Sequence, residues 1–186
     1  MRLTGALILL IWTTTIAYSQ EWNSARLSLI YGSDIPFNFN SMQKYRDGIE
    51  ILDGTILGIS LADSSAAGHT LEGFDLNIRT FNGATFIRGD VNNLSLDRIR
   101  IKAENYLGLS TGFTYGYVDL SAVWTTLFSY TNPAFTGLSW DTDQISISYE
   151  CGKPVSQGGN GSLLGEDPGP YTIELEIEII PAGPGF

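Results

Sequence analysis

Two reactive residue types are almost missing from this sequence: its 186 residues include one cysteine, Cys151, and one histidine, His69. A single cysteine forms no internal disulfide, so packing must stabilise the fold. We predict that Cys151 is a partly buried, small apolar side chain; an intermolecular disulfide or a nucleophile is the alternative. His69 follows Gly68 among small residues, and no motif joins it to a nucleophile or a metal-ligand set. The sequence therefore predicts no enzyme, no metal site and no cofactor.

Basic residues are also scarce, with 10 Lys and Arg against 20 Asp and Glu and a net charge of −10. Nucleic-acid binding relies on clustered cations, so no nucleic-acid partner is expected. The densest basic group is Arg98, Arg100 and Lys102. Because these residues alternate with apolar ones, we interpret them as one solvated strand face.

The apolar run at residues 3–16 is too short to span a bilayer comfortably. It follows Arg2 and precedes Ala17 and Ser19, which are the small residues of a signal-peptidase site. We expect residues 1–19 to be a signal peptide cleaved before Gln20, with no transmembrane anchor afterwards; a retained anchor is the alternative. Residues 20–186 then form a single domain that is secreted or held at the cell surface.

Alternation of apolar and polar residues predicts an all-β fold, an immunoglobulin-like antiparallel β-sandwich. The expected strands are 27–31, 37–39, 56–61, 74–81, 99–103, 145–149 and 173–179. Segment 41–51 has few apolar anchors and predicts at most a turn or two of helix. Gly and Pro make segment 152–170 a surface loop.

Turn residues predict one local hairpin, in which Asn82-Gly83 joins 74–81 to 84–87 through a tight turn. The final strand, expected over 171–180, puts isoleucine and leucine on one face and Glu174, Glu176 and Glu178 on the other. We interpret these acids as solvated edge protection; cation ligation is the alternative.

Two short segments are rich in oxygen ligands: Asp141-Thr142-Asp143 and Asp90-Val91-Asn92-Asn93. A calcium loop beginning at Asp90 would need Gly where Ser95 stands and Glu where Ile101 stands. We therefore expect these side chains to cap turns.

Nine of the 22 aromatic residues fall between Tyr106 and Trp140. Most should fill the core, because large aromatics dominate the interiors of sandwiches. Tyr and Trp also suit binding surfaces, and Trp140, Trp124 and Tyr130 are the candidate ligand-binding residues.

Several landmarks together resemble the secreted pilin-like β-sandwich domains of the spore-coat-U and fimbrial-subunit type. They are Phe37-Asn38-Phe39-Asn40, Tyr45 with Asp47-Gly48-Ile49, residues 55–61, Phe74-Asp75-Leu76-Asn77-Ile78 and Gly169-Pro170-Tyr171-Thr172. The resemblance implies an immunoglobulin-like fold whose subunits associate by adding a strand to a neighbour's sheet. The paired cysteines common in such subunits are absent, and residues 20–30 are the one candidate donor strand, or else an ordinary first strand.

We therefore predict a non-enzymatic structural or adhesion-type surface subunit whose partners are copies of itself or other surface subunits. A carbohydrate-binding module is one alternative, with carbohydrate as the partner. A small outer-membrane β-barrel is another, although Pro181, Gly183 and Pro184 interrupt the approach to the aromatic terminus.

Overall fold

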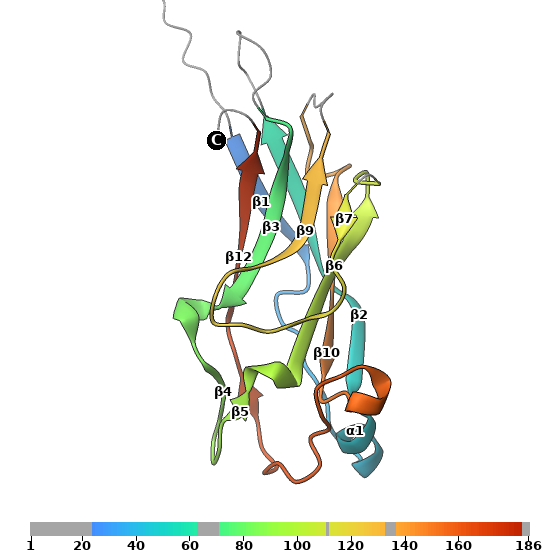
Figure 1. The fold of residues 1–186 in the computed structure, drawn as a ribbon, viewed down its shortest axis with the longest axis vertical. Coiled ribbons are helices and arrows are strands. Elements are labelled where there is room, and N and C mark those ends of the chain that lie inside the picture. The colour runs from blue at the N-terminus through green and yellow to red at the C-terminus, as the bar shows by residue number, and fades with distance from the viewer. Residues whose placement is uncertain (1–23, 63–70, 111, 133–136, 184–186) are drawn as a thin grey trace, which may run out of the picture.

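The fold is known from a computed structural model that describes residues 24–62, 71–110, 112–132 and 137–183 (Figure 1). Strands make up 51% of it and helices 10%, and antiparallel sheets pack against each other, so the predicted all-β class is confirmed. The strands run along the long axis of the molecule (Figure 1). The expected signal peptide, its cleavage site and His69 lie outside the described residues.

The first sheet combines strands from the start of the chain with strands from its middle and later part. Its order is β1 (Ser24–Tyr31), β2 (Ile49–Ala62), β10 (Gln144–Cys151), β6 (Ile99–Leu107) and β8 (Val118–Asp119). All neighbours in this sheet are antiparallel. The fourteen-residue strand β2 is longer than β1, which pairs with its second half alone, from Ser24↔Ala62 to Tyr31↔Ile56.

The second sheet includes the last strand of the chain. Its order is β12 (Leu175–Ala182), β3 (Gly73–Thr80), β9 (Thr125–Thr131) and β7 (Phe113–Thr114). A small third sheet joins β11 (Tyr171–Thr172), β4 (Phe86–Gly89) and β5 (Leu94–Ser95). Short helices complete the fold: α1 (Met42–Asp47), η1 (Phe81–Gly83), η2 (Leu96–Arg98) and η3 (Val155–Gln157).

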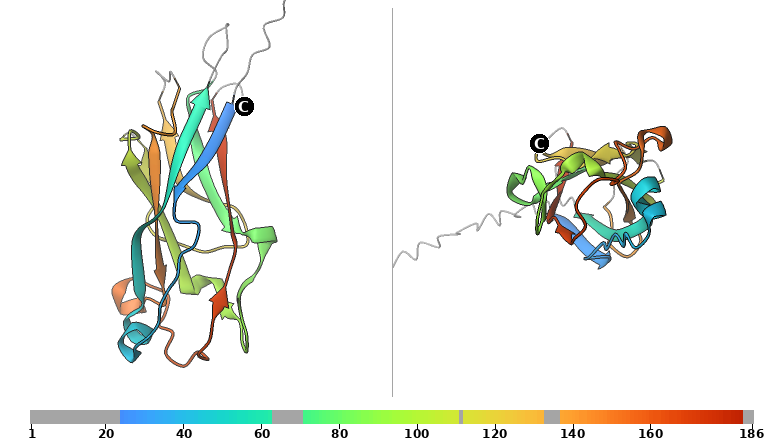
Figure 2. Two further views of the ribbon diagram at one scale, coloured as in Figure 1. Left: turned by 180° about the vertical axis from the view of Figure 1, so that it is seen from behind. Right: turned by 90° about the horizontal axis from the view of Figure 1, so that it is seen from below.

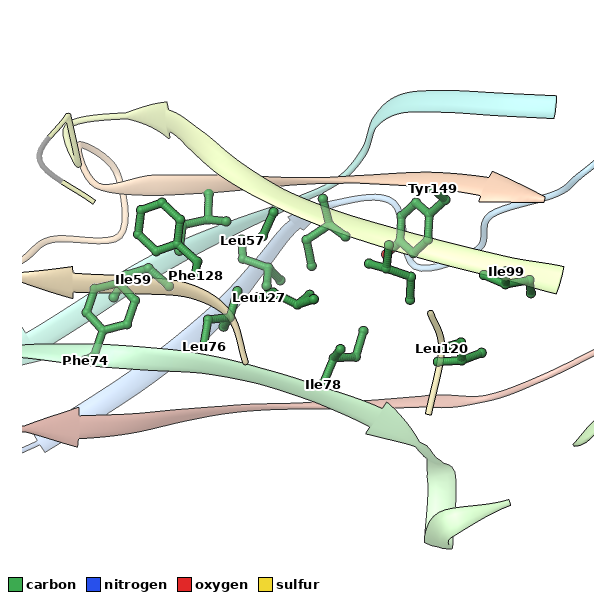
Figure 3. Close-up of a cluster of buried hydrophobic side chains, with 14 of the residues drawn as sticks. Leu57, Ile59, Phe74, Leu76, Ile78, Ile99, Leu120, Leu127, Phe128 and Tyr149 are labelled. Atoms are coloured by element: carbon green, nitrogen blue, oxygen red, sulfur yellow. The ribbon is translucent and has the colours of Figure 1, made fainter. Parts of the chain in front are cut away.

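The hydrophobic core fills the space between the two large sheets, because alternate residues of each strand point inwards (Figure 3). Leu57 and Ile59 of β2 and Leu76 and Ile78 of β3 are all buried there. Phe74 has its ring centroid 6.1 Å from that of Phe128 and 5.7 Å from that of Tyr130. Most of the large apolar side chains that the alternation predicts to be internal are therefore internal.

Six of the predicted strands correspond to β1, β2, β3, β6, β10 and β12, although β3 ends one residue before the predicted 81 and β12 begins two residues after the predicted 173. At segment 37–39 the prediction is wrong. In that segment the alternation is real, since Ile35, Phe37 and Phe39 are partly buried against the core, yet no ladder forms. The helix prediction is confirmed by α1, whose first turn is capped by the Ser41 side chain. Cys151 is buried, as predicted.

The hairpin predicted at Asn82-Gly83 is wrong. Both residues have the positive φ that a tight turn needs, 52° and 68°, but they close the short helix η1. Phe81 N–H donates to Glu174 and the Thr80 hydroxyl donates to Ala84, so the chain leaves the sheet here. Strand β4 then pairs with β5 and β11, and β3 pairs with β12 and β9.

The basic row is not the open, solvated face that we predicted. Arg98 lies in η2 and pairs with Glu166 at 3.2 Å. Arg100 lies 3.3 Å from Glu150, a carboxylate with 3% of its side chain exposed. Loop 152–161 packs over this face and supplies partners, so carboxylates and carbonyls surround cations that sequence alone places in water.

Candidate functional site

The two large sheets end on the same side of the molecule, the first at β1 and the second at β12. No ladder joins β1 to β12 in the described part of the chain, so each presents a free strand edge. In Figure 2 (left), β1 runs beside β12 in the upper half, and below it the chain continues without a strand towards α1. The lower half of this side is therefore bounded by irregular backbone.

An apolar groove of about 1040 Å³ opens in this lower half. One wall is residues 32–39, the other is residues 169–177, and the floor comes from both large sheets and the small one. The apolar lining is Leu29, Ile35, Phe37, Phe39, Leu57, Phe81, Ile87, Leu94, Ile99, Leu120, Leu163, Ile173, Leu175 and Ile177. The groove is thus a continuation of the core that reaches the surface.

A hydrogen-bonded chain fixes the floor where the first wall begins. The Thr55 hydroxyl donates to the Gly32 carbonyl at 2.9 Å and lies 2.8 Å from the Tyr149 hydroxyl. Because Thr55 has one hydroxyl proton, Tyr149 must donate to Thr55. Gly32 has φ +79°, and a Cβ there would lie 1.8 Å from the Gly54 carbonyl oxygen. Only glycine fits this turn, where the chain leaves β1.

Cys151 also lines the groove, at the end of β10. Burial raises the pKa of its thiol to about 12. A thiol held neutral in this way is unreactive, so it acts as a small apolar side chain on the floor.

The first wall of the groove contains backbone without hydrogen-bond partners among the described residues. Residues 33–37 make no backbone hydrogen bond within the described part of the chain. On the opposite wall, Ile173 and Glu174 separate β11 from β12, and the Glu174 carbonyl accepts from the Phe81 N–H. The peptide groups of residues 33–37 therefore have free donors and acceptors, and another extended segment could pair with them.

The charges at the groove are of one sign. Asp34, Glu166, Asp167 and Glu174 line it, and the described lining contains no Lys or Arg. Arg98 neutralises Glu166, and Asp167 accepts from Asn92. Asp34 and Glu174, on opposite walls, are exposed and form no ion pair or side-chain hydrogen bond within the described residues. The rim is consequently acidic.

The three candidate ligand-binding aromatics are not brought together. Tyr130 is buried in the core and stacks on Phe74, while its hydroxyl accepts from Asn132. Trp124 lies just before β9, six residues from Tyr130, which corresponds to about 20 Å at 3.3 Å per residue. Arg79 lies 4.4 Å from the centroid of the Trp124 ring. Trp140 stands on the other sheet, where its backbone and Cβ pack against Gly58.

The segment Asp141-Thr142-Asp143 has the turn-capping role that we predicted. The Asp143 carboxylate accepts from the Ser139 N–H at 2.8 Å and from the Thr142 hydroxyl at 3.0 Å. The Asp141 carboxylate accepts from the Ser139 hydroxyl, and this bond lowers the pKa of Asp141. These oxygens are therefore occupied by protein donors.

Sequence reasoning missed the groove itself. Two signals for it were present: Pro36 within the alternating segment 33–39, which removes a ladder donor, and the mixed apolar and acidic pattern of segment 173–177. Neither shows from sequence alone that the two segments face each other.

No protein-family model matches the chain, and no curated protein matches it in sequence. In the described residues, no helix is long and apolar enough to cross a membrane.

Proposed function

We propose that this protein is a non-enzymatic extracytoplasmic structural subunit that takes an extended segment of a partner into the groove between residues 32–39 and 169–177. The observation that supports this is the groove, which is apolar, open to solvent and bounded on one side by backbone without a ladder. An inserted strand would cover the apolar floor and pair with the free peptide groups of the wall. At 3.3 Å per residue, the wall of residues 33–39 accommodates a strand of about seven residues.

The strand order supports an immunoglobulin-like assignment. A constant-type immunoglobulin sandwich places strands A, B, E and D in one sheet and C, F and G in the other. On this assignment β1, β2, β10 and β6 are A, B, E and D, and β3 and β12 are C and F. Strands β9 and β7, which extend the second sheet beyond β3, have no counterpart in the constant-type order. The G position would lie at the free edge of β12, where the described residues place no strand. We propose that the partner segment occupies it.

The resemblance to spore-coat-U and fimbrial subunits agrees with this proposal, since such subunits associate by strand addition. The expected export signal agrees with it too, because a surface assembly requires secretion. The four carboxylates at the groove have no histidine or cysteine thiolate beside them in the described residues, and this pattern favours binding.

The test is selection of displayed random peptides on the native chain. Strand addition predicts that enriched peptides alternate apolar and polar residues and slow the labelling of Cys151 by a maleimide. An Ile35→Asp/Phe37→Asp double variant should lose the selected peptides, because it places charge on the apolar wall. The control is Val91→Asp, an exposed site outside the groove. Enriched peptides without alternation, or equal binding to the wall variant, would contradict the proposal.

Carbohydrate binding is a second candidate, favoured by one observation: Trp140 keeps 53% of its surface exposed. An exposed tryptophan face beside Asp141 suits stacking on a sugar ring. A glycan array probed with wild type and Trp140→Ala tests it, with Trp124→Ala as the control for loss of an aromatic ring elsewhere. Binding that Trp140→Ala leaves intact would remove its support.

A further inference from the structure

We infer that the occupant of the groove is an extended, alternately apolar segment of a different polypeptide, with Lys or Arg between its apolar residues. This inference rests on the proposed function and adds the chemistry of the partner. It is carried by the charges of the groove and of the whole chain.

The floor of the groove determines which residues of the occupant are apolar. Leu57, Ile99 and Leu120 lie beneath the groove and are each less than a tenth exposed. An inserted strand shows alternate side chains to the floor and to solvent. Every second residue of the occupant must therefore be apolar.

The acidic rim of the groove determines the charge of the occupant's outward-facing residues. Outward-facing residues of an inserted strand would lie between Asp34 on one wall and Glu174 on the other, and neither acid has an internal partner in the described residues. Opposite charges on neighbouring strands attract, and like charges repel. Because the described lining offers no cation, an acidic segment would find no compensation, while Lys or Arg would pair with both walls.

The same charges disfavour a second copy as donor. The chain carries a net charge of −10, so two copies repel as they approach. The one candidate donor from the sequence, residues 20–30, contains Glu21 and Arg26 and is neutral. Its described part, within β1, already pairs with β2 from Ser24↔Ala62 to Tyr31↔Ile56. Donating it would break that ladder.

The experiment uses the full chain and four labelled peptides. Three share one alternating apolar pattern and carry Lys, Gln or Glu at the outward positions, and the fourth is residues 20–31 of this chain. Affinity is measured by fluorescence anisotropy, with protection of Cys151 from maleimide as a second readout. The protein variants are Asp34→Asn/Glu174→Gln and the control Glu72→Gln/Glu104→Gln, which removes two acids outside the groove.

We expect the Lys peptide to bind about tenfold more tightly than the Gln peptide and to lose that advantage between about 50 and 500 mM salt. The Asp34→Asn/Glu174→Gln variant should also remove it, and the control should keep it. Equal binding of the Lys, Gln and Glu peptides would overturn the charge inference and leave the proposed function standing. Tightest binding of the 20–31 peptide would overturn it in favour of a second copy. If no peptide binds or protects Cys151, the proposed function fails as well.

Discussion

The hydroxyl oxygens of Thr55 and Tyr149 lie 2.8 Å apart beneath the groove, in side chains that are 3% and 4% exposed. The Thr55 hydroxyl donates a hydrogen bond to the carbonyl of Gly32, so the pair ties β2 and β10 to the residue at which the first wall begins. A polar contact within an apolar floor therefore fixes the position at which the first wall begins.

Replacing Thr55 by Val should destabilise the fold by about 1–3 kcal/mol, because the buried Tyr149 hydroxyl and the partly buried Gly32 carbonyl both lose their partner. Thr55→Ser keeps the hydroxyl and should cost less. Urea unfolding of both variants measures the difference. A Thr55→Val protein as stable as Thr55→Ser would show that the hydrogen-bonded chain contributes nothing.

A second prediction concerns Glu150, whose buried carboxylate contacts Arg100 and Lys153. Glu150→Ala removes the carboxylate that both cations share, and it should lower the free energy of unfolding by about 2–4 kcal/mol. This loss is somewhat smaller than for a fully buried pair, because both cations keep some contact with water. Glu104→Ala is the matched control, because the Lys102–Glu104 pair is more exposed and should be worth about 1 kcal/mol or less. Equal losses in the two variants would contradict this account.

The pH dependence of stability should report the hydrogen bond from Tyr117 to Glu50. The Tyr117 hydroxyl donates to the Glu50 carboxylate at 2.9 Å, and this bond is the main cause that lowers the pKa of Glu50. A carboxyl group with a lowered folded pKa stabilises the fold above its unfolded pKa of about 4.3, and that stability is lost as the pH falls through the folded value.

Tyr117→Phe should therefore be less stable than wild type at pH 7 and should lose less stability than wild type on acidification to pH 3. Urea unfolding at a series of pH values measures both. A stability difference between the two proteins that does not change with pH would assign the effect of the substitution to packing instead.

Alternation predicts six of the strands, because inward positions such as Leu57, Leu76 and Ile147 are selected by burial. It does not predict β9, and it predicts a strand at 37–39 where none forms. Pairing could not be predicted in the same way. Asn82 and Gly83 have the backbone angles of a hairpin turn, yet the partner of β3 is β12, almost a hundred residues later, through contacts such as Ile78↔Ile177. Local propensity does not encode contacts over that distance.

The candidate site was less predictable still. An aromatic side chain on an alternating strand has the same sequence signature whether it is buried or exposed, which is why Tyr130 and Trp140 were grouped although one lies in the core and the other at the surface. The groove depends on where the ladders end, at Tyr31 and at Thr172, and these ends depend on neighbouring strands that are distant in sequence.

Alanine substitution of the three aromatics should separate core from surface. Tyr130→Ala should cost about 3–5 kcal/mol, because its ring stacks on Phe74 inside the core. Trp140→Ala should cost about 1 kcal/mol or less, as expected for a half-exposed side chain. Trp124→Ala should fall between them, through the loss of its contact with Arg79. Thermal unfolding gives the order, and a reversed order would place Tyr130 outside the core.

The last prediction uses Cys151, the single cysteine, as a reporter of the groove floor. With a thiol pKa of about 12, about one molecule in ten thousand carries the reactive thiolate at pH 8. Labelling by a disulfide reagent should therefore be about a thousandfold slower than for free cysteine, whose pKa is about 8.5.

Labelling should reach the rate of free cysteine when urea unfolds the chain, and the native protein should run as a monomer on a non-reducing gel. Leu163→Ala provides a sharper comparison, because Leu163 packs beside Gly152 and covers the floor next to the thiol. That variant should label faster than wild type while Leu164→Ala, at the exposed neighbouring position, should not. Rapid labelling of the folded wild-type chain would mean that burial does not keep the Cys151 thiol neutral.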